Sequence, residues 1–252
     1  MKQYKKIYEL KNAAKDKLEG KYGGAILIFI LSSMISGAVR LFINAVASLT
    51  MDSVYNLTSS VGAATAISFV FDAILLFAGV LMGVMNVGIA LYFLNLACGQ
   101  PRKIGDLFYG FQTNSKTALI ITGSIVLCQT LCLWPGQYLL QNYLNTRQSE
   151  WLLYSAAALV IGLCIYIPIS LGITMSLYLM LDFPQNSGTK TLSLCWRIMK
   201  GHRRRLFCLE LSFLPLSILC VLSFGIGFLW LYPYMQMTYT YFFLDLMNPA
   251  QA

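Results

Sequence analysis

The chain has little charge and few of the side chains that carry out chemistry. Charged residues make up 11% of its 252 residues and there is one histidine, whereas about 25% charged residues is usual in globular proteins. Hydrophobic residues reach 58%, more than a soluble domain of this size is able to bury. Composition therefore excludes a soluble domain, a disordered chain and a collagen-like fibre. What remains is a protein whose outer surface faces lipid.

The scarcity of histidine and of acidic residues also limits the sites that the chain is able to build. His202 lies beside Lys200 and Arg203, and a single histidine cannot form a histidine-rich metal site. Cys128 and Cys132 share a helix face, but they have no histidine or acid nearby to complete a zinc site. The sequence contains no nucleophile elbow. We therefore expect no catalytic residue, no metal, no cofactor and no enzymatic role.

Long apolar runs occupy most of the chain. The last of five such runs, residues 206–247, is long enough for two spans of about 20 residues and is interrupted at Gly225 and Gly227. The pattern predicts an all-α polytopic membrane bundle of six transmembrane helices arranged as three hairpins. Their predicted bounds are 22–44, 73–97, 117–138, 153–180, 206–224 and 228–247. Residues 45–72 stay open as an outer-face helix, a loop or an extension of the second span.

The basic residues fall on one side of this arrangement. Sixteen of the 18 lysines and arginines precede the first span or lie between spans two and three or four and five. The positive-inside rule then places both termini in the cytoplasm. Lipid headgroups explain such residues, so we expect anionic headgroups and not nucleic acid as the partner. The candidate membrane-surface residues are Lys15, Lys17, Lys21, Arg102, Lys103, Lys200, Arg203, Arg204 and Arg205.

The three cytoplasmic segments resemble one another. Each has a short amphipathic stretch, a glycine and then basic or polar residues, and the glycines Gly20, Gly110 and Gly201 lie 90 and 91 residues apart. We predict a cytoplasmic interfacial helix before each hairpin. The alternative is that any loop between spans tends to be basic and amphipathic. Within a single membrane domain of residues 1–252, the possible repeat units are 1–99, 100–188 and 189–252.

Charges inside the spans are few. Arg40 lies 18 residues after Tyr22, which is about 27 Å of helix rise and places it near the outer interface. Asp72 falls just before the predicted second span, at a similar predicted depth. We predict an Arg40–Asp72 ion pair at the outer end. Reversing both charges tests it, because a true pair regains stability in the double variant.

Several motifs resemble a bacterial membrane-protein family, the one catalogued as domain of unknown function 975. The resemblance departs at Pro215 and at the basic run of residues 203–205. It implies a multi-pass protein of a bacterial cytoplasmic membrane and brings no activity, substrate or catalytic residue. The motifs that carry it are Ala14-Lys15, Leu18-Glu19-Gly20-Lys21-Tyr22, Asp106-Leu107-Phe108-Tyr109-Gly110-Phe111, Met199-Lys200-Gly201-His202, Leu206-Phe207, Leu211-Ser212-Phe213, Gly225-Ile226-Gly227-Phe228-Leu229-Trp230 and Tyr232-Pro233-Tyr234.

Two functions of different classes fit the sequence. We favour a non-enzymatic envelope scaffold or accessory, which binds lipid or a membrane-protein partner or forms a homo-oligomer through its basic inner face. The alternative is a permease for a small molecule or lipid, with its site between the hairpins. A scaffold is expected to be packed through its centre. A permease is expected to hold a polar cavity at mid-depth, lined by residues such as Asn86, Asn95, Gln129 or Thr174.

Overall fold

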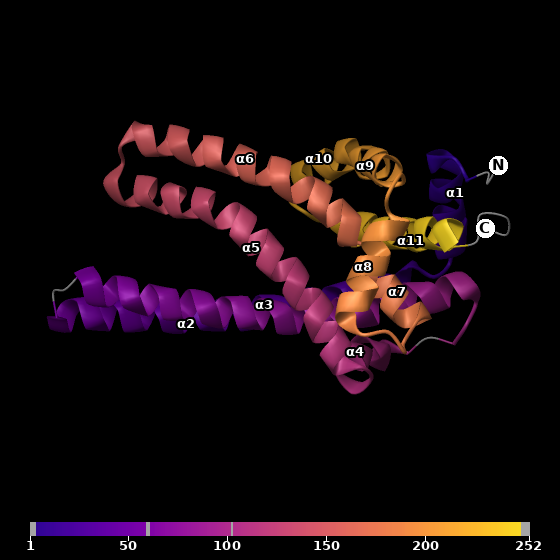
Figure 1. Ribbon diagram of the computed structural model, residues 1–252, viewed down its shortest axis with the longest axis horizontal. Coiled ribbons are helices and arrows are strands. Elements are labelled where there is room, and N and C mark those ends of the chain that lie inside the picture. The colour runs from indigo at the N-terminus through magenta and orange to yellow at the C-terminus, as the bar shows by residue number, and fades with distance from the viewer. Residues whose placement is uncertain (1–3, 59–60, 102, 248–252) are drawn as a thin grey trace.

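The computed structural model describes residues 4–58, 61–101 and 103–247 (Figure 1). These residues form helices joined by short turns, and no strand occurs among them. The helices are α1 (Ile7–Leu18), α2 (Tyr22–Thr58), α3 (Val61–Cys98), the 3-10 helix η1 (Ile104–Phe108), α4 (Tyr109–Gln112), α5 (Ser115–Thr146), α6 (Ser149–Ile173), α7 (Ser176–Asp182), α8 (Gly188–Ile198), α9 (Arg203–Leu211), α10 (Leu214–Leu222) and α11 (Phe228–Met247). The predicted all-α class is confirmed.

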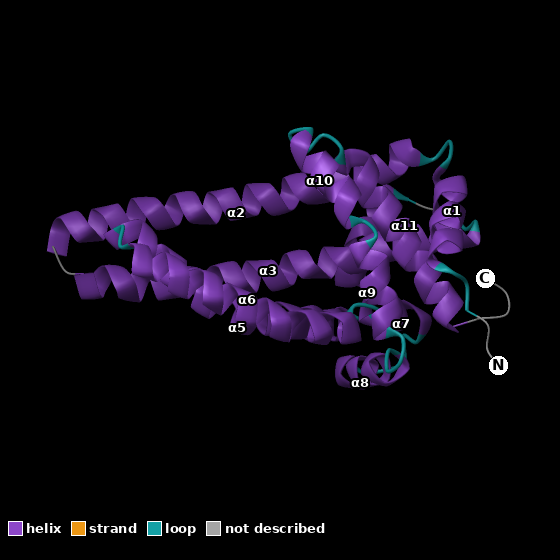
Figure 2. Cartoon of the chain, turned by 90° about the horizontal axis from the view of Figure 1, so that it is seen from above, coloured by secondary structure: helices purple, strands orange, loops and turns teal. Residues whose placement is uncertain are grey.

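Two long hairpins give the molecule its elongated shape. In Figure 1, α2 and α3 form one hairpin and α5 and α6 form the other, with both tips at the same end. The shorter unit of α9, α10 and α11 lies at the opposite end, together with α4, α7, α8 and the N-terminal helix α1. Figure 2 shows from above that α2 stands away from α3 over much of its length. We call the end that holds the two hairpin tips the tip end, and the opposite end the base of the bundle.

Of the stretch 45–72 left open by the sequence, residues 45–58 extend α2 and residues 61–72 extend α3. Helix α2 has 37 residues and α3 has 38, so each is about 55 Å long. A hydrocarbon core is about 30 Å thick, which shows how far the helices exceed one span. Residues 45–58 and 61–72 contain no proline, so each of these extensions keeps its helical N–H donors.

Five helical segments are long and apolar enough to cross a membrane. Among the described residues they are Tyr22–Met51, Ile67–Cys98, Ser115–Leu144, Ser149–Asp182 and Arg203–Leu222. Helix α11 forms over the residues expected for a sixth span, but it is not one of the five. Much of α11 is buried, from Leu231 to Leu246, and its polar Thr238, Thr240 and Asp245 lie inside the protein. The six-span, three-hairpin arrangement stays a prediction.

Two of the predicted spans are broken helices. Pro168 lies inside α6, which continues to Ile173 before a turn leads into α7. The expected span 206–224 is divided into α9 and α10, and Pro215 stands in the first turn of α10. Proline is tolerated there because the first turn has no hydrogen-bond acceptor for its missing N–H. The expected span 206–224 corresponds to the segment Arg203–Leu222, which is long and apolar enough to cross a membrane, and a turn at residues 212–213 divides it.

Helices form in all three predicted cytoplasmic segments, and they pack on protein. Helix α1 lies against α11, η1 and α4 lie against α3, and α8 lies against α5 and α7. The fit of η1 depends on Gly88, because a Cβ atom at that position would stand 2.3 Å from the carbonyl oxygen of Leu107. Gly20 and Gly201 both have positive φ, whereas Gly110 lies within α4. The interfacial placement and the threefold repeat stay predictions.

Most buried side chains lie at the base. Phe213, Phe242 and Phe243 form one cluster with residues of α7 and α8, and Phe93, Leu107 and others form a second cluster with α1 and α3. Toward the tips the helices expose large apolar side chains, among them Leu131 at 74% and Leu153 at 72%. An apolar exterior on helices of this length is the surface expected of a protein in lipid.

Candidate functional site

A polar cavity lies between the first hairpin and α5. Its volume is about 750 Å³, and residues of α2, α3 and α5 supply most of its lining. Leu177 of α7 and Tyr232 of α11 complete it toward the base. Its polar lining residues are Ser32, Ser33, Ser36, Arg40, Asn44, Asp72, Asn86, Thr122, Gln129, Thr130 and Gln137.

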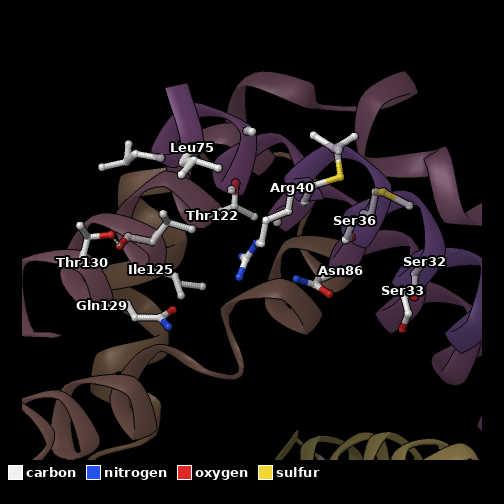
Figure 3. Close-up of a pocket in the computed structure, with 18 of the residues that line it drawn as sticks. Ser32, Ser33, Ser36, Arg40, Leu75, Asn86, Thr122, Ile125, Gln129 and Thr130 are labelled. Atoms are coloured by element: carbon white, nitrogen blue, oxygen red, sulfur yellow. Dashed lines mark hydrogen bonds between the residues drawn. The ribbon is translucent and has the colours of Figure 1, made fainter. Parts of the chain in front are cut away.

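Asn86 marks the cavity on α3. It is an exposed side chain within a stretch, residues 84–90, whose other members are all buried. Asn86 lies 12 residues before Cys98, so it stands about 18 Å from the base end of α3. A side chain that is accessible at this depth faces internal space, and Figure 3 shows its amide pointing into the cavity.

Arg40 is the dominant charge of the cavity. In Figure 3 its side chain crosses the cavity, and its guanidinium group points between Gln129 and Asn86. Arg40 is exposed, and no hydrogen bond or ion pair is recorded for its side chain among the described residues. Helix rise predicted the depth of Arg40 along its helix and did not predict this inward direction.

Arg40 and Asp72 line the same cavity. The structure thus brings the predicted pair to one place, but the ion pair that it records within the described residues joins Arg205 to Asp245. Arg40 precedes the end of α2 by 18 residues, whereas Asp72 follows the start of α3 by 11. Asp72 therefore stands about 10 Å nearer the tip end than Arg40. Direct pairing of the two stays a prediction.

A pattern in the sequence marks the α2 wall. Ser33, Ser36, Arg40 and Asn44 follow one another at intervals of three, four and four residues, which places them on one face of a helix. The sequence reasoning did not identify this polar stripe. Of the four residues named for a permease cavity, Asn86 and Gln129 line it, and Asn95 and Thr174 do not.

The cavity is closed toward the base. The rings of Phe29 and Tyr232 stack with their centroids 4.3 Å apart, and both residues belong to the lining. Beyond them Ile28, Phe93 and Met237 are fully buried. The hydroxyl groups of Thr122 and Thr130 donate to carbonyl oxygens of their own helix, at 2.8 Å each. The hydroxyl group of Ser32 likewise donates to the carbonyl oxygen of Phe29 at 3.0 Å. Within the described residues, the polar lining groups with no recorded hydrogen bond are the amides, Ser33, Ser36, Arg40 and Asp72.

The candidate membrane-surface residues gather at the base, with different degrees of exposure. Lys15, Lys103, Lys200 and Arg204 are exposed, whereas Lys17, Lys21, Arg203 and Arg205 are partly buried. Arg102 lies outside the described residues. Arg203 stands over the ring of Trp196 with 3.7 Å to its centroid. Binding of headgroups by these nine residues stays a prediction.

Arg205 has a protein partner. Its guanidinium group pairs with the carboxylate of Asp245 and donates to the backbone carbonyl of Lys5. The backbone N–H of Lys5 donates to the same carboxylate at 3.2 Å. Asp245 is completely buried and Arg205 is 17% exposed. The three residues thereby fasten the segment before α1 to α9 and α11.

Helix α1 carries titratable groups whose pKa is shifted, among them Glu9 and Lys11. The carboxylate of Glu9 accepts the backbone N–H of Lys6 at 2.8 Å and the hydroxyl group of Tyr8 at 3.0 Å, and these bonds lower the pKa of Glu9. Partial burial lowers the pKa of Lys11, whose ammonium group donates to the carbonyl oxygen of Ser212 at 3.0 Å. Glu9 thus stabilises the start of α1, whereas Lys11 ties α1 to the end of α9.

No group of three or more metal-ligating side chains occurs among the described residues.

The profile of a family described as "Protein of unknown function (DUF975)" matches residues 1–249, nearly the whole chain. The chain belongs to the DUF975 family. This confirms the resemblance found in the sequence. Comparison of this DUF975 protein with curated proteins and with solved structures found no match.

Proposed function

We propose that this DUF975 protein is a permease-type membrane protein that binds a small polar or amphiphilic molecule in the cavity of α2, α3 and α5. The cavity itself is the observation that carries the proposal. Its volume of about 750 Å³ falls in the range of about 300–1,000 Å³ typical of ligand sites. A scaffold would be packed where this chain has polar, accessible side chains such as Asn86. The proposal is non-enzymatic, since it assigns no chemical step to the cavity.

Transport through this site would require a change at the Phe29–Tyr232 stack. That stack and the buried cluster beyond it separate the cavity from the base. The α2 wall, in contrast, is polar and accessible from Ser33 to Asn44. The arrangement fits a protein whose ligand enters from the tip side or from the membrane. Alternating access would then involve movement of the first hairpin against α11.

We propose that the base faces the cytoplasm of a bacterial cell and that the chain crosses the cytoplasmic membrane with both termini inside. The exposed basic residues at the base support this orientation through the positive-inside rule. Single cysteines in a cysteine-free background test it. Cysteines at positions 56 and 147 are expected to react with an impermeant thiol reagent from outside, and cysteines at 103 and 190 are not. The reverse pattern would overturn the orientation.

A second function rests on the surface of the base. Ile104, Phe108 and Trp196 are 50%, 41% and 43% exposed, close to Lys103 and Lys200. Apolar and basic side chains in this mixture fit the headgroup region of a membrane. Such a surface also suits the scaffold or accessory role, in which it binds anionic lipid, a membrane-protein partner or a second copy of the chain. This role is supported if anionic vesicles bind the isolated wild-type protein and do not bind a folded variant that lacks Lys103 and Lys200.

The cavity proposal is tested by water accessibility. Ser36 lines the cavity, and Leu41 lies nearby on α2 with 72% exposure of its apolar side chain. In a cysteine-free background we expect Ser36→Cys to react with a polar thiol reagent about tenfold faster than Leu41→Cys, because the reactive thiolate forms only in water. Equally slow reaction of the two cysteines would show a dry centre and favour the scaffold.

A further inference from the structure

The cavity presents two opposite charges that are separated from each other. No hydrogen bond or ion pair is recorded for the side chain of Arg40 or of Asp72 within the part of the chain that the structure describes. Charges at membrane depth are costly unless a partner or water compensates them. Because both side chains face one cavity, a molecule inside it is able to compensate both at once.

The two charges prefer different groups on a ligand. The guanidinium group of Arg40 offers parallel N–H donors that match a carboxylate or a phosphate. Asp72 offers acceptors only, which suit an ammonium group. Asp72 stands about 10 Å nearer the tips along the hairpin, and the reach of the two side chains shortens the distance that a ligand must bridge.

Neutral polar groups stand beside Arg40. Asn86 and Gln129 approach its guanidinium group from α3 and α5 (Figure 3), and neither amide has a recorded hydrogen bond among the described residues. Each amide supplies donors and an acceptor, so they are able to satisfy the remaining oxygens of a carboxylate or phosphate. Apolar side chains such as Leu75 and Ile125 complete the wall and suit the apolar part of an amphiphile.

We infer that the cavity binds a zwitterion, with its carboxylate or phosphate on Arg40 and its ammonium group on Asp72. This inference rests on the proposed function, and it names the ligand class. A zwitterion enters without adding net charge to the cavity, whereas a simple anion would leave Asp72 without a counterion. Two sources share this chemistry: a lipid headgroup such as phosphoethanolamine, and a free amino acid or short peptide.

The test uses the full chain with Ser36→Cys as the reporter, in a cysteine-free background and in maltoside micelles. The probes are short-chain phosphatidylethanolamine and phosphatidylglycerol, together with two free zwitterions, glycerophosphoethanolamine and leucine. We expect a zwitterionic probe to slow labelling of the reporter by about tenfold at saturation, because it excludes water and reagent from the cavity. Protection by phosphatidylethanolamine alone identifies a lipid, and protection by the free zwitterions identifies a soluble ligand.

Charge variants show whether both residues hold the ligand. Arg40→Gln and Asp72→Asn are each expected to raise the concentration needed for protection about tenfold, the usual effect of losing a charge-assisted hydrogen bond. Arg147→Gln is the matched control, because Arg147 ends α5 outside the cavity lining. The comparison among probes is made with Arg40 and Asp72 both in place. It therefore distinguishes a zwitterion site from an anion site even if a charge variant does not fold.

Three results would overturn the inference. Equal protection by phosphatidylglycerol, with no effect of Asp72→Asn, would indicate an anion site. If the reporter reacts and no zwitterion slows its labelling, the zwitterion inference is wrong. The water-filled cavity and the proposed function then remain. A reporter that does not react at all would contradict the proposed function itself.

Discussion

The two ends of the bundle solve different problems. At the base, short helices cross and bury their side chains, so Phe93, Phe213 and Phe242 are almost inaccessible. Along their middle, the long helices α2, α3 and α5 leave a polar cavity between them. The same chain thus has a closely packed base and a cavity beyond it. Stability is expected to reside in the base, and ligand binding at mid-length.

Charge is used differently at the two ends as well. The base contains an arginine, Arg205, that is paired with a buried carboxylate and bonded to the backbone of the N-terminal segment. The cavity contains an arginine, Arg40, for whose side chain no hydrogen bond or ion pair is recorded within the described residues. A side chain with protein partners stabilises the fold, whereas one that points into an open cavity is available to a ligand. The following predictions test this division.

The largest effect is expected from removing Arg205. Arg205→Met leaves the completely buried carboxylate of Asp245 without its counterion, and loss of one partner of a buried pair typically costs about 3–5 kcal/mol. Unfolding in detergent, followed by tryptophan fluorescence, measures the change. The control is Arg204→Met, because its side chain is exposed. Equal effects of the two substitutions would show that the base does not depend on this pair.

The next effect comes from the close approach of η1 to α3. Gly88→Ala would place a methyl group 2.3 Å from the backbone oxygen of Leu107, so η1 must move, at a cost of about 1–3 kcal/mol or more. Gly37→Ala in α2 meets nothing within 4 Å and is expected to be neutral or stabilising. The same unfolding measurement compares them. An unaffected Gly88→Ala protein would contradict the packing described for the base.

Substitutions in the cavity are expected to change stability little. Gln129→Ala and Asn86→Ala remove side chains with no hydrogen bond recorded in the described part of the chain, so each is expected to stay within about 0.5 kcal/mol of the wild type. Thermal unfolding of the purified proteins provides the measurement, with Gly88→Ala as the destabilised reference. A loss comparable to that of the reference would mean that the amides hold the fold together and are not free for a ligand.

The smallest effect is a pH dependence at α1. Hydrogen bonds from Lys6 and Tyr8 lower the pKa of Glu9 in the folded state. A lowered pKa adds stability above the unfolded pKa, and this contribution is lost as the pH falls through the folded pKa. We therefore expect a slight fall of the unfolding midpoint in acid, below about pH 4. The Glu9→Gln protein should lack this part of the dependence. An identical acid response in wild type and variant would remove Glu9 as its source.

Much of the fold follows from the apolar pattern, because helices in lipid need long apolar runs. The pattern predicted helices over the long apolar runs, including α11 at residues 228–247. It did not predict that α2 continues to Thr58 and that α3 begins at Val61, since polar residues there weaken a hydropathy signal without breaking a helix. The break between α9 and α10 was missed for a related reason. Pro215 is compatible with a helix start, and only tertiary packing decides where that start lies.

The site was harder to predict than the fold. Asn86 and Gln129 were identified as polar residues at mid-depth, and both line the cavity. Arg40 was assigned to the outer interface because helix rise gives depth but not direction. Its direction depends on α3 and α5, which lie far from it in sequence. The spacing of Ser33, Ser36 and Asn44 around Arg40 was the available signal for a polar helix face.

A crystal structure grown in a lipid mesophase is the most direct test of the division between the two ends. We expect a cavity between α2, α3 and α5 that contains water or ligand density beside Arg40, with the Phe29–Tyr232 stack closing it toward the base. A contradictory result would be α2 packed directly on α5, with Ser36 against Gln129 and no space between them. In that case the chain would be packed from base to tips, as a scaffold is.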